Sequence, residues 1–244
     1  MSFDLSIENT QKVCQVKAKR LKRSKILIPV NKKEEPDYAF MQSYIVQKEK
    51  EQIQHYQKYI SNKIDKAKSN KRIEELELKN WEIFEIGKLF KLSQGKSKGL
   101  NHLTKIPTGI NYLGATNLNN GVLCQVSNDE NLIHKGNAIA FIRNGEGSMG
   151  YSIYKAENFI ATSDISVGYN QNLNRYIGMF ITTIADKARG KYNFGYKRSG
   201  KRLSKEKIML PVNEKQEPDY EYMENYMKQL EYKKLNEYLI KKSS

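Results

Sequence analysis

A dense run of cations lies between positions 187 and 207. Nine lysines and arginines stand there against one acid, Glu206, with three aromatic residues interleaved and glycines at 190, 195 and 200. Cations on such a loop can neutralise phosphates and release counterions, which gives affinity without sequence preference. A solvated basic surface loop is the alternative interpretation. The candidates for backbone contact with a nucleic acid are Lys191, Tyr192, Tyr196, Lys197, Arg198, Lys201 and Arg202.

Recognition of a base sequence needs polar side chains that reach base edges. Such side chains occur near predicted turns earlier in the chain. Arg143 could form a two-toothed hydrogen bond with guanine, although arginine is equally suited to a phosphate. Each of these residues could also serve a turn or the surface, and they are candidates as a set on the loops of one domain. The set is Gln94, Lys96, Lys98, Asn117, Asn119, Arg143 and Asn144.

The sequence shows no convincing active site. "GEGSMG" at 145–150 has the spelling of a dinucleotide-binding loop, but "YSIY" follows it with the alternation of a strand, where that loop requires a helix. "GKS" at 95–97 lacks the earlier glycine of a phosphate-binding loop. The three histidines and two cysteines lie far apart and have no metal-ligand spacing. We therefore expect no catalytic residue, no metal and no cofactor.

Composition narrows the class of partner. The formal net charge is +15 over 244 residues, which favours a polyanion such as nucleic acid or an anionic membrane. No apolar run approaches the roughly 20 residues that span a bilayer, and the N-terminus lacks the pattern of a signal peptide. Cys14 and Cys124 fit reduced thiols. Cytoplasmic nucleic-acid binding without a membrane partner is the expectation.

One segment of the sequence occurs twice, 182 positions apart. "KILIPVNKKEEPDYAFMQSY" begins at Lys25 and "KIMLPVNEKQEPDYEYMENY" at Lys207, and the match extends upstream to Lys19 and Lys201. About 15 of the 26 aligned positions are identical. The repeat indicates a duplicated module that ends in a strand and a helix. The residues before Lys19 do not match those before Lys201, so residues 1–35 are expected to be the remnant of a first unit, with "SFDLSIE" as an edge strand.

Each repeat leads into a predicted helix, one over 36–79 and one over 217–244. Pro36 and Pro218 suit the first helical position. We expect the two helices to pair as an antiparallel coiled coil, because helices this long and charged are not stably buried alone. Two exposed helices that pack only on their own globular units are the alternative. The residues expected to pair are Met41, Ile45, Ile53, Tyr56, Ile60, Ile64, Met223, Met227, Leu230 and Leu235.

A domain rich in Gly, Asn, Thr and Tyr, residues 80–216, is expected between these helices. "NAIAFIRNG" and "SMGYSIYKAENFIAT" read as strands around a glycine turn, "NRYIGMFITTIADKA" as a helix, and "KIMLPV" as a closing strand. The expected fold class is α+β: one mixed domain plus two long helices.

This order of elements resembles a specificity subunit of type I restriction–modification systems. The residues that carry the resemblance are "WEIFEIGKLFKLSQGK", "FIRNGEGSMGYSIYKAENFIATSDI" and "KRLSKEKIMLPVNEKQEPDYEYMENYMKQLE", with the repeated junction. Full members alternate two target-recognition domains with two conserved helices, whereas this chain has one such domain.

The resemblance implies a non-catalytic subunit that binds double-stranded DNA by sequence and docks adenine methyltransferase subunits and a restriction or translocase subunit. Because one domain is absent, we expect a half-subunit that dimerises or pairs with another specificity subunit. Two other interpretations stay open: a fragment of a restriction or modification enzyme with its own activity, and a coiled-coil scaffold associated with RNA.

Overall fold

The computed structural model describes residues 25–67 and 74–243. The chain divides after Tyr59 into two compact units, and each is described by itself. The expected edge strand "SFDLSIE" and the upstream part of the first repeat lie outside the described residues. No helix in the described part of the chain is long and apolar enough to span a membrane.

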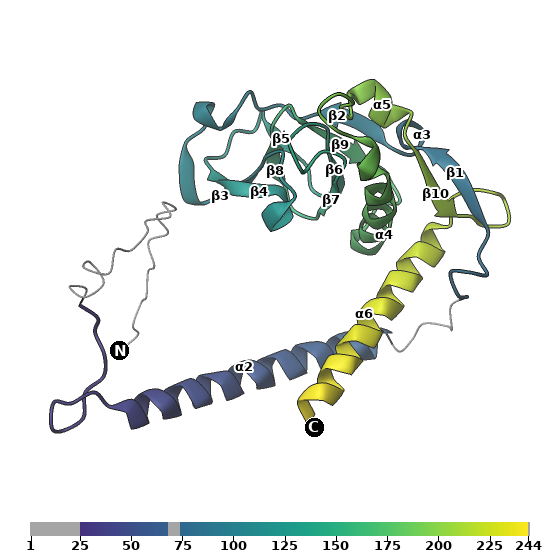
Figure 1. Cartoon of the computed structure of the whole chain (residues 1–244). Coiled ribbons are helices and arrows are strands. Elements are labelled where there is room, and N and C mark those ends of the chain that lie inside the picture. The colour runs from purple at the N-terminus through teal and green to yellow at the C-terminus, as the bar shows by residue number, and fades with distance from the viewer. Residues whose placement is uncertain (1–24, 68–73, 244) are drawn as a thin grey trace. The chain divides into compact units, whose positions relative to one another are not determined.

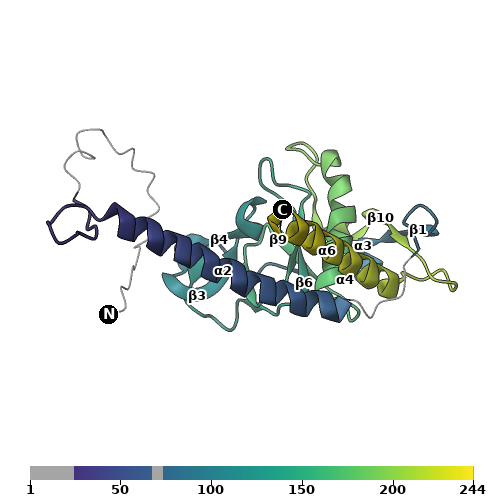
Figure 2. The ribbon, with the colours of Figure 1, turned by 90° about the horizontal axis from the view of Figure 1, so that it is seen from below.

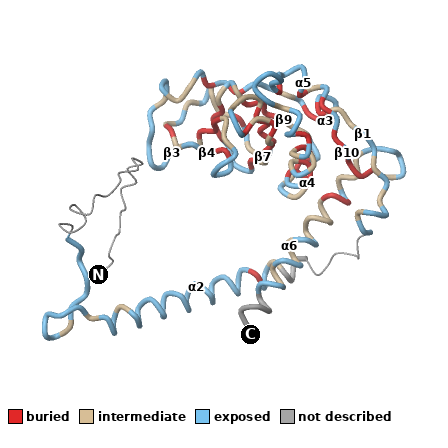
Figure 3. Tube along the Cα trace, viewed as in Figure 1, coloured by how far each residue is buried: buried red, intermediate tan, exposed pale blue. Residues whose placement is uncertain are grey.

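The first unit consists of the first repeat and most of helix α2 (Tyr38–Ala67). Nearly all of α2 is exposed, as its pale blue colour in Figure 3 shows. Met41 is half-buried, and Ile45 and Ile53 are exposed.

The larger unit contains three small sheets (Figure 1). The first is antiparallel, in the order β2 (Lys91–Gln94), β9 (Ile165–Tyr169), β6 (Ala138–Ile142), β7 (Ser152–Lys155). The second has the order β4 (Val122–Val126), β3 (Lys105–Leu113), β8 (Phe159–Ala161), β5 (Ile133–His134), and its β3–β8 pair is parallel. In the third, β1 (Trp81–Glu85) pairs antiparallel with β10 (Lys207–Pro211).

Helix α4 (Arg175–Ala185) is the centre of the core. It begins where the Asn174 side chain accepts hydrogen bonds from two backbone N–H groups, which satisfies donors that an uncapped helix leaves free. It packs against β6, β7 and β10 and lies beside α6 (Tyr220–Ser243), as Figures 1 and 2 both show. Phe180 of α4 contacts the rings of Trp81 and Tyr226. The shorter helices are α3 (Ile86–Leu89), α5 (Gly200–Ser204) and three 3-10 turns, η1 (Leu100–His102), η2 (Leu118–Gly121) and η3 (Asp186–Lys191).

The expectation of a mixed α and β domain is confirmed. "NAIAFIRNG" forms β6, the segment after the glycine turn forms β7 and β8, "NRYIGMFITTIADKA" forms α4, and "KIMLPV" forms β10. The "GEGSMG" stretch is a turn between β6 and β7, with positive φ at each of its three glycines. Helix α4 was predictable because its apolar positions follow a period of about 3.6 residues, and β6, β8 and β10 because each contains a short apolar run.

The prediction of one helix over 36–79 was wrong in its C-terminal part. Helix α2 ends at Ala67, and residues 74–79 form a turn. Leu76 in that turn packs against the domain core, and its carbonyl accepts a hydrogen bond from the Trp81 indole at 3.2 Å. Burial of Leu76 against the domain is a tertiary contact, so the helical pattern of the sequence could not reveal it.

The two repeats adopt the same local structure. Asn31 and Asn213 each accept two backbone N–H hydrogen bonds through the side-chain oxygen, at 2.8–3.1 Å. Glu34 and Gln216 both have a positive φ, 61° and 60°. The matched turns account for the recurrence of Pro-Val-Asn and Glu-Pro-Asp-Tyr in the two repeats, because these residues form the turn and the helix cap.

Each turn leads to a helix that is capped by an aspartate. The Asp37 carboxylate accepts a hydrogen bond from the backbone N–H of Phe40, the third residue of its helix, at 2.9 Å. The Asp219 carboxylate accepts one from the backbone N–H of Tyr222 at 3.0 Å. The helices begin at Tyr38 and Tyr220, so the prolines lie just before the cap and not at the first helical position that the sequence suggested.

The predicted pairing stripe of α6 begins inside its own domain. Met223 is fully buried in the core with residues of α4 and β10, and Met227 packs beside it. The expectation that Met223 faces the other long helix is therefore corrected, because the domain itself covers it, whereas Met227 is only half-buried and its pairing stays a prediction. Further along α6, Leu230 is exposed and Leu235 is half-buried.

Candidate nucleic-acid interface

The basic segment runs from η3 through the turn Asn193–Tyr196 and α5 to the start of β10. Most of its cations are exposed, whereas Ala188 of η3 and Leu203 of α5 are buried beneath them. The exposed cations are Lys187, Arg189, Lys191, Lys197, Lys201, Arg202, Lys205 and Lys207. We call this surface the basic platform.

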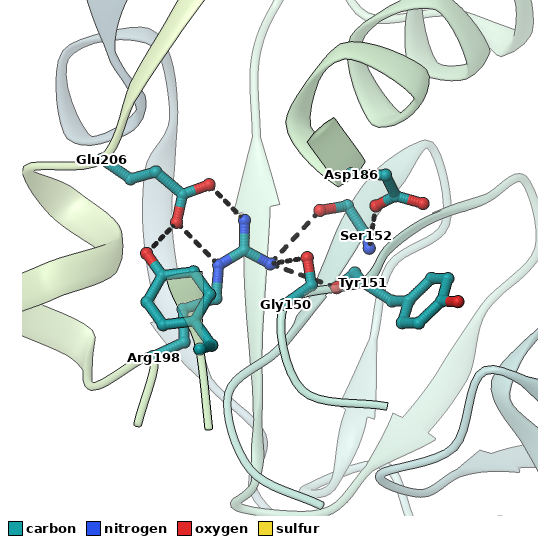
Figure 4. Close-up of polar contacts among 7 residues, drawn as sticks. Gly150, Tyr151, Ser152, Asp186, Arg198 and Glu206 are labelled. Carbon is teal, nitrogen blue, oxygen red and sulfur yellow. Dashed lines mark hydrogen bonds and ion pairs between the residues drawn. The ribbon is translucent and has the colours of Figure 1, made fainter. Parts of the chain in front are cut away.

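Arg198 does not belong to that surface. Its side chain is fully buried, and Figure 4 shows it between Glu206 and the start of β7. Its guanidinium donates to both carboxylate oxygens of Glu206, at 2.9 and 2.6 Å, and to the carbonyls of Gly150 and Tyr151, at 2.9 and 3.1 Å. The expectation that Arg198 contacts a phosphate is corrected: it is an internal tie.

The aromatic residues of the platform are fixed by this tie. The Tyr192 hydroxyl donates to Glu206, and burial, together with that carboxylate, raises the pKa of Tyr192 well above its usual value. The Tyr196 ring stacks on Tyr192 with 6.1 Å between ring centroids. The guanidinium of Arg202 lies 3.9 Å from the Tyr196 centroid. The exposed Arg202 guanidinium of the platform therefore lies on a stacked pair of tyrosine rings.

Three of the predicted base-reading residues come together at the turn before β9. Gln94 Nε2 donates to the carbonyl of Ser163 at 3.1 Å, and Arg143 Nη2 donates to the same oxygen. Asn144 donates to the Asp164 carboxylate at 3.1 Å. Gln94, Arg143 and Asn144 thus each form a hydrogen bond within the domain.

Arg143 also lies beside the basic platform. A side-chain carbon at Gly200, the first residue of α5, would stand 3.7 Å from Arg143 Nη1. The Nε atom of Arg143 is buried without a hydrogen-bond partner. The loop after β6 and the platform are therefore neighbours, although they lie more than 40 positions apart in the sequence.

The remaining candidates lie elsewhere on the domain. Lys96 Nζ donates to the carbonyl of Ile133 at 3.0 Å. Burial, with a smaller contribution from Lys96, lowers the pKa of His134 to about 4, so this imidazole is neutral at pH 7 and stacks on Phe159. Lys98 is exposed. Asn117 and Asn119 are exposed at η2, where Asn119 has a φ of 48°.

A cleft of about 780 Å³ separates the turn after β6 from the basic platform. One wall carries Asn144 and Tyr151, and the other carries Arg189, Asn193, Phe194 and Lys197. Of these, Tyr151, Arg189, Asn193 and Phe194 are not among the candidates that the sequence analysis selected, and Arg189 and Phe194 entered it only as members of the basic run. Nothing in the sequence distinguishes Tyr151, while the Asn-Phe-Gly-Tyr order is typical of a tight turn and could have pointed to Asn193.

In the described part of the chain, no group of three His, Cys, Asp or Glu side chains is placed to hold a metal ion.

Comparison with known proteins gives the family. A family model described as "Type I restriction modification DNA specificity domain" matches residues 78–239. The chain is 28% identical over 233 residues to the type II restriction enzyme specificity subunit S.BcgI of Heyndrickxia coagulans, covering 93% of this chain and 65% of that protein. The chain thus spans less than two thirds of the length of this relative.

Solved structures that this chain partly matches include the S subunit of a type I restriction–modification system from M. genitalium. It is 18% identical, with a TM-score of 0.48, over 78% of this chain and 51% of that one. Another is the HsdS subunit from Thermoanaerobacter tengcongensis, 10% identical, with a TM-score of 0.45, over 80% and 51%. Because the family model covers well over half of the sequence, this chain belongs to the type I restriction–modification DNA specificity family.

Proposed function

We propose that this chain binds double-stranded DNA by sequence and brings adenine methyltransferase subunits, and a restriction or translocase subunit, to its target in the cytoplasm. Residues 80–216 hold the DNA, and the chain contributes no chemistry of its own. The observation that carries the proposal is the basic platform. Its exposed cations can neutralise phosphates, and the side chains of the neighbouring cleft can reach base edges.

The two long helices form the dock and spacer in this proposal. The part of α2 that belongs to the larger unit supports their pairing. Ile60 is fully buried, and Lys63 forms an ion pair with Glu231 of α6 at 2.9 Å. The expected contact at Ile64 concerns a side chain outside the described residues, and Tyr56 is exposed.

Self-association, or pairing with another specificity subunit, completes the proposed assembly. The two repeats provide the support. In the second repeat, Ile208 and Val212 are 4% and 3% exposed, because β10 pairs with β1 and packs on the core. Their counterparts in the first repeat, Ile26 and Val30, are 78% and 57% exposed. The first repeat therefore displays apolar positions that a second protein surface can cover. A symmetric dimer would read two like half-sites in opposite orientation.

A charge on the exposed apolar positions of the first repeat should prevent this association. We expect Ile26→Glu combined with Val30→Glu to convert a dimer into a monomer, because both side chains are exposed and a dimer that buries them would have to desolvate the added carboxylates. Analytical ultracentrifugation measures the change. Gln54→Glu with Gln57→Glu adds the same charge at exposed positions of α2 and should leave the dimer intact. The proposal would be contradicted if the wild-type chain is monomeric at high concentration and if its complex with a methyltransferase contains a single copy and no other specificity subunit.

Selection of bound duplexes from a random pool tests the DNA-binding function itself. We expect the purified chain to enrich one sequence, and its affinity to fall steeply as salt rises, because counterions are released on binding. If RNA of matched length competes as well as duplex DNA for the purified chain, the result would instead favour the RNA-associated scaffold. Turnover by the chain alone with a divalent metal or a methyl donor would favour the enzyme fragment.

A further inference from the structure

Phe194 is the most exposed aromatic side chain among the described residues, at 89%. It stands at the tip of the turn Asn193–Tyr196, on the wall of the cleft. A single exposed apolar residue needs no explanation by itself. What distinguishes Phe194 is that its surroundings keep it exposed and rigid.

The turn beneath Phe194 is fixed by its own hydrogen bonds. The Asn193 side chain accepts from the backbone N–H groups of Gly195 and Tyr196, at 2.9 and 3.0 Å. The backbones of Asn193 and Tyr196 also bond to each other in both directions, at 3.3 and 3.0 Å. A turn closed in this way cannot easily fold its tip back onto the domain.

The base of the turn is anchored in the domain interior. Tyr192, just before the turn, hydrogen-bonds Glu206, and the buried Arg198 just after it bonds the same carboxylate. Arg198 also bonds the carbonyls of Gly150 and Tyr151 on the opposite wall of the cleft, as Figure 4 shows. One buried guanidinium therefore fixes both walls, so Phe194 is held in place before any ligand binds.

The charges around the ring select the ligand. Lys197 Nζ lies 5.5 Å from the Phe194 centroid, and Lys191 and Lys201 are exposed nearby in the sequence. A partner that covers this ring must carry negative charge and offer flat apolar faces. Base pairs between phosphate backbones have both properties, and proteins that bend DNA insert apolar side chains between base steps.

We propose that Phe194 inserts between two adjacent base pairs of the bound duplex and partly unstacks them. This inference rests on the proposed DNA-binding function. Lys191, Lys197 and Lys201 hold the flanking phosphates, while the cleft side chains Asn144 and Arg189 face the bases of the opened step. Arg189 is steadied there by its hydrogen bond to the Tyr151 hydroxyl at 2.5 Å and by the Tyr151 ring beneath it.

The test uses the full chain and the duplex chosen by the selection above, with 2-aminopurine placed at successive positions. Unstacking raises 2-aminopurine fluorescence, so we expect the wild-type chain to produce a rise of several-fold at one step. Phe194→Ala should abolish that rise and weaken binding about 5- to 140-fold, the range of one lost base–aromatic contact. The salt dependence should stay the same, because no phosphate contact is removed. Phe194→Trp should retain the rise.

Matched controls separate the possible outcomes. Phe40→Ala removes an exposed phenylalanine of the first unit and should change neither signal. An unchanged rise in Phe194→Ala overturns the wedge while DNA binding stands. Phe194→Ala that binds DNA normally but no longer co-purifies with a methyltransferase overturns it in favour of a protein contact. If the wild-type chain itself retains no duplex, the proposed function fails, and the wedge fails with it.

Discussion

Replacing Arg198 with methionine should lower the free energy of unfolding of the domain by about 3–5 kcal/mol. The change removes five hydrogen bonds, which end on Glu206 and on residues 150–152, and leaves the Glu206 carboxylate buried without its cation. Urea unfolding followed by the fluorescence of Trp81 measures the loss, because this single tryptophan of the chain packs against the domain core.

Two further variants show whether the buried pair is the cause. Lys201→Met removes the same charge from an exposed position and should change stability by no more than about 0.5 kcal/mol. Replacing Arg198 and Glu206 together with methionine should recover much of the loss, because no unpaired buried charge remains. Arg198→Met as stable as the wild type would show that Arg198 lies at the surface after all.

Removing four exposed cations from the basic platform should nearly abolish DNA binding at physiological salt. The variant replaces Lys191, Lys197, Lys201 and Lys205 with glutamine. Log affinity falls as log salt rises, and the loss of each lysine that contacts a phosphate should make this negative slope shallower by about 0.9. Fluorescence anisotropy with the selected duplex at several salt concentrations gives both the affinity and the slope.

The matched control moves the same charge change to the first unit. Lys32, Lys33, Lys50 and Lys58 are exposed there, and their replacement by glutamine lowers the net charge equally. We expect this control to keep most of the affinity and of the salt slope. An equal loss in both variants would mean that net charge, and not the platform, drives binding.

The Tyr192 phenol beneath the platform should stay protonated in the folded protein at neutral pH. The pKa of Tyr192 is raised by burial and by Glu206, so its phenol stays neutral far above the pH at which free tyrosine ionises. Because the folded pKa is higher than the unfolded one, the folded state holds this proton more tightly, and the contribution to stability is lost only as pH rises above the unfolded value. The platform should therefore keep its structure throughout the neutral range.

The sequence by itself determined the mixed domain, helix α4 and the strands β6, β7, β8 and β10, but not the remaining strands. A period of about 3.6 residues reports which face of a helix is buried, and a short apolar run reports a buried strand, whatever the neighbours are. The repeated junction was equally legible, because its turn depends on local hydrogen bonds from Asn31 and Asn213 and on the caps Asp37 and Asp219. Local interactions leave their mark at fixed spacings in a sequence.

Only the tertiary structure decided the use of individual residues. Arg198 and Lys197 are adjacent cations in the sequence, yet one is fully buried and the other is exposed on the platform. Met223 looks like a helix-pairing residue and lies in the domain core, and Leu76 ends a helical pattern by packing against that core. In each case the partner is distant in the chain, and composition and periodicity carry no information about distant partners. The same reason hides the cleft, whose two walls are joined by Arg198 and by the hydrogen bond from Arg189 to Tyr151.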